Sequence, residues 1–158
     1  SVIQRCQATL QANQQQAEIW HELGTTWYLM ERYDAAESAL TQAVALEPEN
    51  GRYLYSLGLT LEKQGKVVNA AQTYQKALSC DRTLLDAYNN LGNLVVEHGD
   101  PSQAEPLYHQ AIQINPSHVG SYLNLGNLLL TQNRLEEAIQ TYLRALELEP
   151  ANSAVLEN

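Results

Sequence analysis

The sequence predicts an all-α fold, a solenoid built from antiparallel helix hairpins. Three observations predict it: a sequence repeat of constant length, small residues at fixed places within that repeat, and turn residues between the copies. A Leu-Gly pair recurs at one constant interval, as Leu23-Gly24, Leu57-Gly58, Leu91-Gly92 and Leu125-Gly126. Alanines keep the same interval, at positions 36, 70, 104 and 138 and again at 43, 77, 111 and 145. Columns that stay in phase over four copies indicate a repeated supersecondary unit.

Each copy contains two amphipathic stretches. In the first copy, Trp20, Leu23 and Trp27 are three or four residues apart and therefore share one helical stripe. Ala36 and Leu40 begin a second stripe with the same spacing. We expect one solenoid domain with a second helix of a partial copy at 1–16, four full copies at 17–50, 51–84, 85–118 and 119–152, and the start of a further helix at 153–158.

Turn residues lie where the helices should end. Gly65 and Gly99 fall at the expected ends of first helices, where glycine is the favoured residue. Asp100-Pro101 is typical of a helix N-cap followed by a proline in the first turn. Prolines separate the copies at 48, 116 and 150, with Arg82 in the remaining place. Pro106 lies several residues inside a predicted helix, so we expect it to cost a backbone hydrogen bond or to bend the helix.

The repeated columns resemble the tetratricopeptide repeat (TPR) family over residues 17–152. The first copy reads Trp20, Leu23-Gly24, Trp27, Ala36, Leu40, Ala43 and Pro48, and the last reads Tyr122, Leu125-Gly126, Leu129, Ala138, Tyr142, Ala145 and Pro150. The resemblance implies a right-handed superhelix in which the first helix of each copy lines a concave groove. It also implies that the groove binds proteins or peptides.

Groove positions implied by the resemblance are the second, fifth, ninth and twelfth of each copy, with the sixth and thirteenth beside them. The candidate peptide-binding residues chosen from these positions are His21, Thr25, Arg52, Tyr55, Asn89, Asn90, Asn93, Asn124 and Asn127. A carboxamide donates and accepts, so a row of asparagines can pair with the backbone of an extended peptide whatever its side chains. The alternative, given equal weight, is that these asparagines cap helices or bond between adjacent helices.

The asparagine-rich stretch is similar to the TPR arm of O-linked N-acetylglucosamine transferases. In that family an asparagine at the sixth position grips the backbone of protein substrates, which carries over to Asn90, Asn124 and Asn158. Glu22 and Ser56 interrupt the row in the first half, and the transferase's catalytic region has no counterpart. Another TPR subclass clamps a C-terminal carboxylate with lysine at the fifth position. Here the fifth positions are His21, Tyr55, Asn89 and Leu123, so the clamp is missing.

Catalytic and metal-binding patterns are missing from the sequence. The four histidines lie at four different repeat positions, and no two have the i, i+4 spacing of a helical metal site. No glycine-rich phosphate loop or nucleophile elbow occurs. Cys6 and Cys80 are too few for a disulfide framework and are expected to be small buried hydrophobes. We therefore predict no enzyme activity in this segment, no cofactor and no metal.

The charge is strongly acidic, with a net charge of −9 and a pI near 4.8. Nucleic acid and anionic membrane surfaces would be repelled, so neither is an expected partner. Residues 17–50 carry seven acidic residues and one basic residue, whereas residues 51–84 carry two and five. A complementary protein or peptide would be neutral to basic, although a solvated acidic exterior explains the charge equally well. The polar, Gln-rich N-terminus is not a signal peptide, and we expect a cytoplasmic location.

The sequence thus favours a scaffold that holds an extended peptide or a partner helix in its groove. Two alternatives stay open. The segment could be the substrate-recruiting arm of a larger enzyme such as a glycosyltransferase. It could also be a structural module that self-associates end to end through uncovered repeat ends, since each hairpin needs a neighbour to bury its apolar face.

Overall fold

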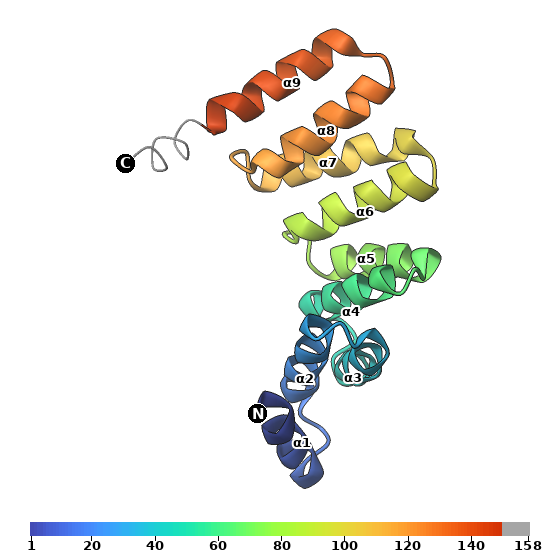
Figure 1. Ribbon diagram of the computed structural model, residues 1–158, viewed down its shortest axis with the longest axis vertical. Helices are drawn as coiled ribbons and strands as arrows, with labels where there is room; N and C mark the ends of the chain where they lie inside the picture. Colours follow the sequence, from blue (N-terminus) through green and yellow to red (C-terminus); the bar gives the residue numbers. More distant parts are fainter. Residues whose placement is uncertain (150–158) are drawn as a thin grey trace. The chain divides into compact units, whose positions relative to one another are not determined.

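The computed structural model describes residues 1–149 and divides the chain into two compact units, Ser1–Leu84 and Leu85–Asn158 (Figure 1). Unit 1 contains α1 (Val2–Ala12), α2 (Ala17–Leu29), α3 (Tyr33–Leu46), α4 (Gly51–Lys63) and α5 (Val67–Cys80). Unit 2 contains α6 (Leu85–His98), the short 3₁₀ helix η1 (Pro101–Gln103), α7 (Ala104–Ile114), α8 (Val119–Thr131) and α9 (Leu135–Leu148). No strand occurs among the described residues, which confirms the predicted all-α class. The further helix expected at 153–158 lies outside them.

Successive helices pair as antiparallel hairpins, α2 with α3 and α4 with α5 in unit 1, and α6 with α7 and α8 with α9 in unit 2. The glycine of each Leu-Gly pair makes this close pairing possible. A Cβ atom placed on Gly92 would lie 2.5 Å from Cε1 of Tyr108, and one on Gly58 would lie 2.7 Å from Cδ1 of Tyr74. The missing side chain therefore admits a whole tyrosine ring between the helices of these hairpins, and Leu40 fills the corresponding space beside Gly24.

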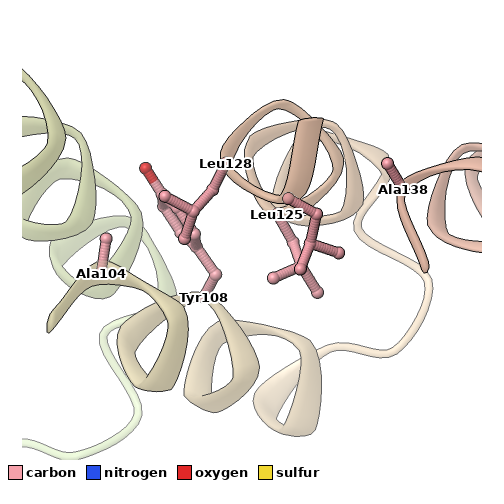
Figure 2. Packing of buried hydrophobic residues seen from close by; sticks show 6 residues of the cluster. Ala104, Tyr108, Leu125, Leu128 and Ala138 are labelled. Atoms are coloured by element: carbon pink, nitrogen blue, oxygen red, sulfur yellow. The ribbon is translucent and has the colours of Figure 1, made fainter. Parts of the chain in front are cut away.

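The core of unit 2 is built around this ring. Tyr108 is buried with Ala104 from α7, Leu125, Leu128 and Leu129 from α8, and Ala138 from α9. Figure 2 shows the tyrosine and the leucines filling the space between α7 and α8. Burial of aromatic and aliphatic side chains supplies most of the stabilisation of such a stack, at about 25 cal/mol per Å² of apolar surface.

The core of unit 1 holds Cys6 and Leu10 of α1 against Leu23 of α2 and Ala39 of α3. Cys6 is buried as predicted, but Cys80 is exposed at the C-terminal end of α5, so the prediction for that thiol is wrong. Cys80 is the last residue of α5, and its side chain lies beyond the part of the helix that packs in the core.

Pro106 lies at the start of a helix that is shorter than its counterparts in the other copies. The chain makes the 3₁₀ turn η1 first and begins α7 only at Ala104, so Pro106 is the third residue of α7. The first four N–H groups of a helix have no partner within it, so proline removes no hydrogen bond there. The expected cost is met one turn earlier, because the other second helices begin at Tyr33, Val67 and Leu135, which correspond to Pro101, and among these described helices a 3₁₀ turn replaces the first α-helical turn only here. Asp100 caps the turn as expected, by accepting from the Ser102 N–H at 3.0 Å.

Candidate protein-interaction site

A cleft of about 170 Å³ opens in unit 2 along α6 and α8. Its lining residues come from the two first helices and from the tyrosine of α7: Asn93, Val96, Glu97, Tyr108, Asn124, Asn127, Leu128 and Thr131. Three of the predicted peptide-binding residues, Asn93, Asn124 and Asn127, therefore share one cleft. Its walls combine carboxamides, aliphatic side chains and one carboxylate, a mixture suited to a polypeptide ligand.

Two tyrosine hydroxyls fix the orientation of two of these carboxamides. Tyr108 donates from its hydroxyl to Asn93 Oδ1 at 2.6 Å, and Tyr142 donates to Asn127 Oδ1 at 2.5 Å. Because each hydroxyl occupies the carbonyl oxygen, both N–H donors of the carboxamide remain for other groups. Burial raises the pKa of Tyr108 to about 12, so its hydroxyl is a neutral donor at ordinary pH.

Asn89 does not line the cleft, because its side chain is only 6% exposed and lies between α6 and α8. Its amide donates to Ser121 Oγ at 3.0 Å, and its carbonyl accepts a longer bond of 3.4 Å from Asn124 Nδ2. The Ser121 hydroxyl lies 2.8 Å from His118 Nδ1, which also accepts from the Ser121 N–H and caps α8. Asn89 and Asn124 thus bond between adjacent helices, which is the alternative weighed for these asparagines.

The same repeat position in unit 1 holds His21, which also bridges two helices. Its Nε2 lies 2.8 Å from Ser56 Oγ, and its ring stacks on Tyr53 with the centroids 4.7 Å apart. Burial, and to a smaller extent the Arg52 guanidinium, hold the pKa of His21 below its ordinary value.

The other predicted residues of unit 1 are only partly brought together. His21, Thr25 and Arg52 line one open cavity of about 690 Å³ with Glu18 and Glu22. The Thr25 hydroxyl donates to the Glu22 carbonyl, and Arg52 forms an ion pair with Glu18 at 3.5 Å.

Two predicted residues lie apart from both openings. The ring of Tyr55 lies next to that of Tyr74, with their centroids 5.9 Å apart, and Tyr55 does not line that cavity. Asn90 is half-buried on α6 and does not line the cleft of unit 2. Asn158, the third residue carried over from the transferase resemblance, lies outside the described residues.

Among residues 1–149, no three His, Cys, Asp or Glu side chains are grouped so as to hold a metal ion. None of the helices in that range is both long and apolar enough to cross a membrane.

The roles of Tyr108 and Tyr142 were not predicted from the sequence, because these tyrosines act through asparagines on another helix. The signal was present, since Tyr108 and Tyr142 follow Asn93 and Asn127 by the same interval and the two pairs lie one repeat apart. That spacing acquires meaning only when the hairpin brings its two helices together.

A model of the tetratricopeptide repeat family matches residues 21–84 and 89–153. The TPR repeat-containing protein MJ1428 of Methanocaldococcus jannaschii is 29% identical over 80 residues, which is 51% of this chain and 14% of that protein. The chain therefore aligns with only a small part of this relative's length.

Solved structures resemble the chain in fold. A crystal structure of MamA has a TM-score of 0.90 at 24% identity, covering 96% of this chain and 89% of its own. YrrB, described as a TPR protein with an unusual peptide-binding site, has a TM-score of 0.79 at 20% identity, covering 98% and 80%. MamA of Desulfovibrio magneticus RS-1, from residue 41 onward, has a TM-score of 0.85 at 15% identity, covering 94% and 84%. These identities support the fold alone and give no support to the specificity of a transferase arm.

Proposed function

Because the chain belongs to the tetratricopeptide repeat family, whose repeats generally mediate protein–protein interaction, we propose that it is a scaffold that holds an extended peptide in the cleft of unit 2. The observation that carries the proposal is the pair of oriented carboxamides, Asn93 and Asn127. The description of YrrB, a protein of similar fold, as a TPR protein with a peptide-binding site adds support for this class of ligand.

An extended peptide has a carbonyl at every residue, and each carbonyl needs a donor when it leaves water. Asn93 and Asn127 offer such donors already turned away from their tyrosines. Because both side chains are already oriented, less conformational entropy is lost when the peptide binds. Val96 and Leu128 on the walls of the cleft give apolar contact for a side chain of the peptide.

The charge of unit 2 favours a neutral to basic peptide. Residues 85–149 carry eight acidic and two basic residues, so their net charge is strongly negative. Both arginines are engaged by glutamates, Arg134 with Glu105 and Glu137 and Arg144 with Glu147. Glu97 lines the cleft itself and would meet a cationic side chain of the ligand.

The test uses a peptide selected from a random-sequence display library against the complete chain. Asn93→Ala combined with Asn127→Ala removes both oriented donors and should weaken binding by about tenfold or more, because each hydrogen bond contributes about 0.5–1.5 kcal/mol. Asn69→Ala, at an exposed asparagine of α5 in unit 1, is the matched control and should leave the affinity unchanged. Unchanged affinity in the double variant, measured by fluorescence anisotropy, would refute the proposal.

A further inference from the structure

One face of the last described hairpin is apolar and exposed. It is formed by Leu123 and Leu130 of α8 and by Leu135, Ile139, Leu143 and Leu146 of α9, whose exposed fractions run from 42% to 57%. We call these six side chains the terminal apolar face. The four residues of α9 are three or four positions apart and therefore form one helical stripe. Ala138 and Ala145, on another side of α9, are buried.

The preceding hairpin shows what such a face is shaped to receive. Asn89, Val96 and Ile112 lie one repeat before Leu123, Leu130 and Leu146. Asn89 bonds to Ser121 and Asn124 of α8, and Val96 and Ile112 pack against the core cluster that contains Leu125, Leu128 and Leu129 of α8. In the hairpin of α6 and α7, the corresponding face therefore packs against the next helix, α8.

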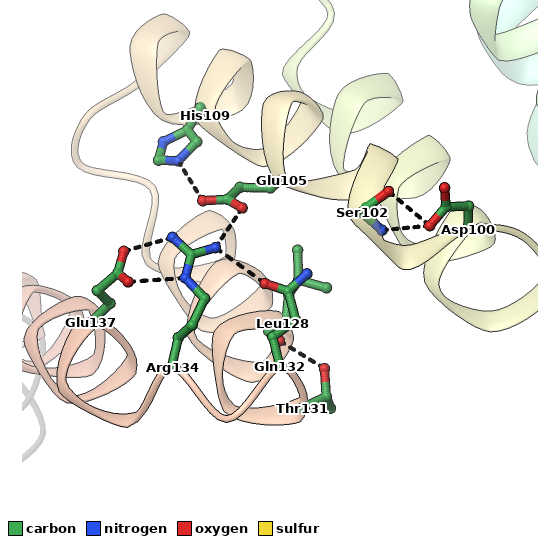
Figure 3. A network of polar contacts seen from close by, with 9 residues as sticks. All are labelled: Asp100, Ser102, Glu105, His109, Leu128, Thr131, Gln132, Arg134 and Glu137. Carbon is green, nitrogen blue, oxygen red and sulfur yellow. Dashed lines mark hydrogen bonds and ion pairs between the residues drawn. The ribbon is translucent and has the colours of Figure 1, made fainter.

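The terminal apolar face differs from the corresponding face of α6 and α7 because it has aliphatic residues in place of charged ones. Ile139 takes the place of Glu105, which accepts from Arg134 Nη1 at 2.7 Å and also lies beside His109, as Figure 3 shows. Glu37, at the corresponding place in unit 1, pairs with Lys66 at 2.6 Å. Leu143 similarly takes the place of His109. The ion pair made by Glu37 and by Glu105 is thus replaced by aliphatic surface; the hairpin of α4 and α5 has Ala71 at this place and no ion pair is formed there.

Carboxylates border the terminal apolar face. Glu136 and Glu147 are exposed on the same side of α9, next to Ile139 and Leu143, with the neutral Gln140 between them. Glu147 has Arg144 as a partner at 2.7 Å, one turn earlier in the helix. Two copies of the chain related by a two-fold axis through this face would bring equal acidic borders together, which disfavours self-association.

We propose that the terminal apolar face binds an amphipathic helix of a partner protein, one with leucine or isoleucine on its inner face and lysine or arginine along its borders. The apolar stripe supplies the contact area of a helix-in-groove interaction, and the acidic border selects a basic flank. This surface is separate from the cleft of unit 2, so the proposal does not depend on the proposed function.

The probe is a synthetic helical peptide about four turns long, with a leucine stripe bordered by lysines. A matched peptide carries glutamates in place of the lysines. The lysine peptide should bind the complete chain about tenfold or more tightly than the glutamate peptide, and hydrogen exchange should show protection over α8 and α9. Equal affinity for the two peptides would overturn the choice of a basic partner.

Substitutions locate the binding. Ile139→Ser with Leu146→Ser should weaken binding of the lysine peptide by about tenfold or more, and because both side chains are exposed the fold should be kept. Val68→Ser removes a similarly exposed aliphatic side chain from unit 1 and should change nothing. Weaker binding in the Asn93→Ala, Asn127→Ala variant, with no effect of the Ile139 and Leu146 substitutions, would place the peptide in the cleft and overturn the proposal.

Two measurements distinguish a partner helix from other possible ligands of the terminal apolar face. Sedimentation should show a monomer; a dimer that Ile139→Ser dissociates would assign the face to a second copy and contradict the proposal. Removal of residues 150–158 should leave the affinity for the lysine peptide unchanged. An affinity that rises by about tenfold on truncation would assign the face to the chain's own following segment.

Discussion

The two units use the same packing for different chemistry. In each, a tyrosine ring of a second helix lies over the glycine of a first helix, Tyr74 over Gly58 in unit 1 and Tyr108 over Gly92 in unit 2. The Tyr74 hydroxyl donates to the Glu62 carboxylate at 2.6 Å, whereas the Tyr108 hydroxyl donates to the Asn93 carbonyl at 2.6 Å. One hydroxyl is thus paired with an anion and the other with a carboxamide that keeps its donors.

The contact between neighbouring first helices differs in the same way. His21 bridges to Ser56 in unit 1, and Asn89 bridges to Ser121 in unit 2. In the first bridge a titratable ring contacts the serine from the neighbouring helix, whereas in the second a carboxamide does so and the ring of His118 lies on the serine's own helix end. The repeat therefore fixes where contacts occur, while the residue at each place decides whether the contact responds to pH or presents donors to a ligand.

The largest expected effect comes from filling the glycine sites. Gly92→Ala and Gly58→Ala each push a Cβ into a tyrosine ring, and overpacking costs about 1–3 kcal/mol. Because the added Cβ would lie only 2.5–2.7 Å from ring atoms, we expect a cost in the upper part of that range, above the gain of about 1 kcal/mol from replacing glycine by alanine in a helix. Both variants should unfold at lower urea concentration, but only Gly92→Ala should weaken peptide binding, since only Tyr108 orients an asparagine of the cleft. Equal losses of peptide affinity in both variants would contradict the proposed difference between Tyr108 and Tyr74.

A smaller effect concerns acid stability in unit 1. Burial and then Arg52 hold the pKa of His21 below its ordinary value, so the unfolded chain binds more protons once the pH falls through about 6.5. The stabilisation is present above that pH and is lost as the pH falls below it. His21→Gln should flatten the pH dependence of the urea midpoint between about pH 7 and pH 5.

Ser56→Ala is the matched control for this titration, because it removes the hydroxyl but keeps the imidazole. It should lower the midpoint without flattening its pH dependence. A His21→Gln chain with the full wild-type pH dependence would show that the imidazole contributes nothing to it.

The smallest effect is expected for the ion pair at the turn of unit 1. Lys66 lies 2.6 Å from Glu37, and its hydrogen bond holds the pKa of that carboxyl below its ordinary value. Both side chains are partly exposed, so Lys66→Met should cost only about 0.2–1 kcal/mol, measured as a shift of the urea midpoint and reduced by salt. Lys76→Met, at an exposed lysine of α5, is the control; an equal shift there would assign the effect to net charge alone.

The fold could be predicted from the sequence because packing imposes the repeat directly. Gly92 and Tyr108 recur one repeat later as Gly126 and Tyr142, and no other residue than glycine leaves room for the ring. The periodic pattern does not show how Pro106 is accommodated, which is by a 3₁₀ turn that delays the start of α7. Helix starts depend on such local competition, which a periodic pattern does not resolve.

The cleft was only partly predictable. Asn93 and Asn127 were chosen from their repeat position, and both line it. The repeat position also predicts Asn89 in the groove, but its place on α6 faces α8 and not solvent. The roles of Tyr108 and Tyr142 depend on contacts across a hairpin, and the terminal apolar face depends on which residues a following helix covers. Both are properties of the packed structure and not of any single helix.

A comparison of Tyr108→Phe with Tyr74→Phe shows whether the Tyr108 hydroxyl prepares Asn93 for a ligand. Each substitution removes one hydroxyl from a buried ring and should cost about 1 kcal/mol of stability. The affinity for the display-selected peptide, measured at equal fractions of folded protein, should fall about fivefold or more in Tyr108→Phe and stay at the wild-type value in Tyr74→Phe. Equal affinities in the two variants would mean that the Tyr108 hydroxyl does not prepare Asn93 for the peptide.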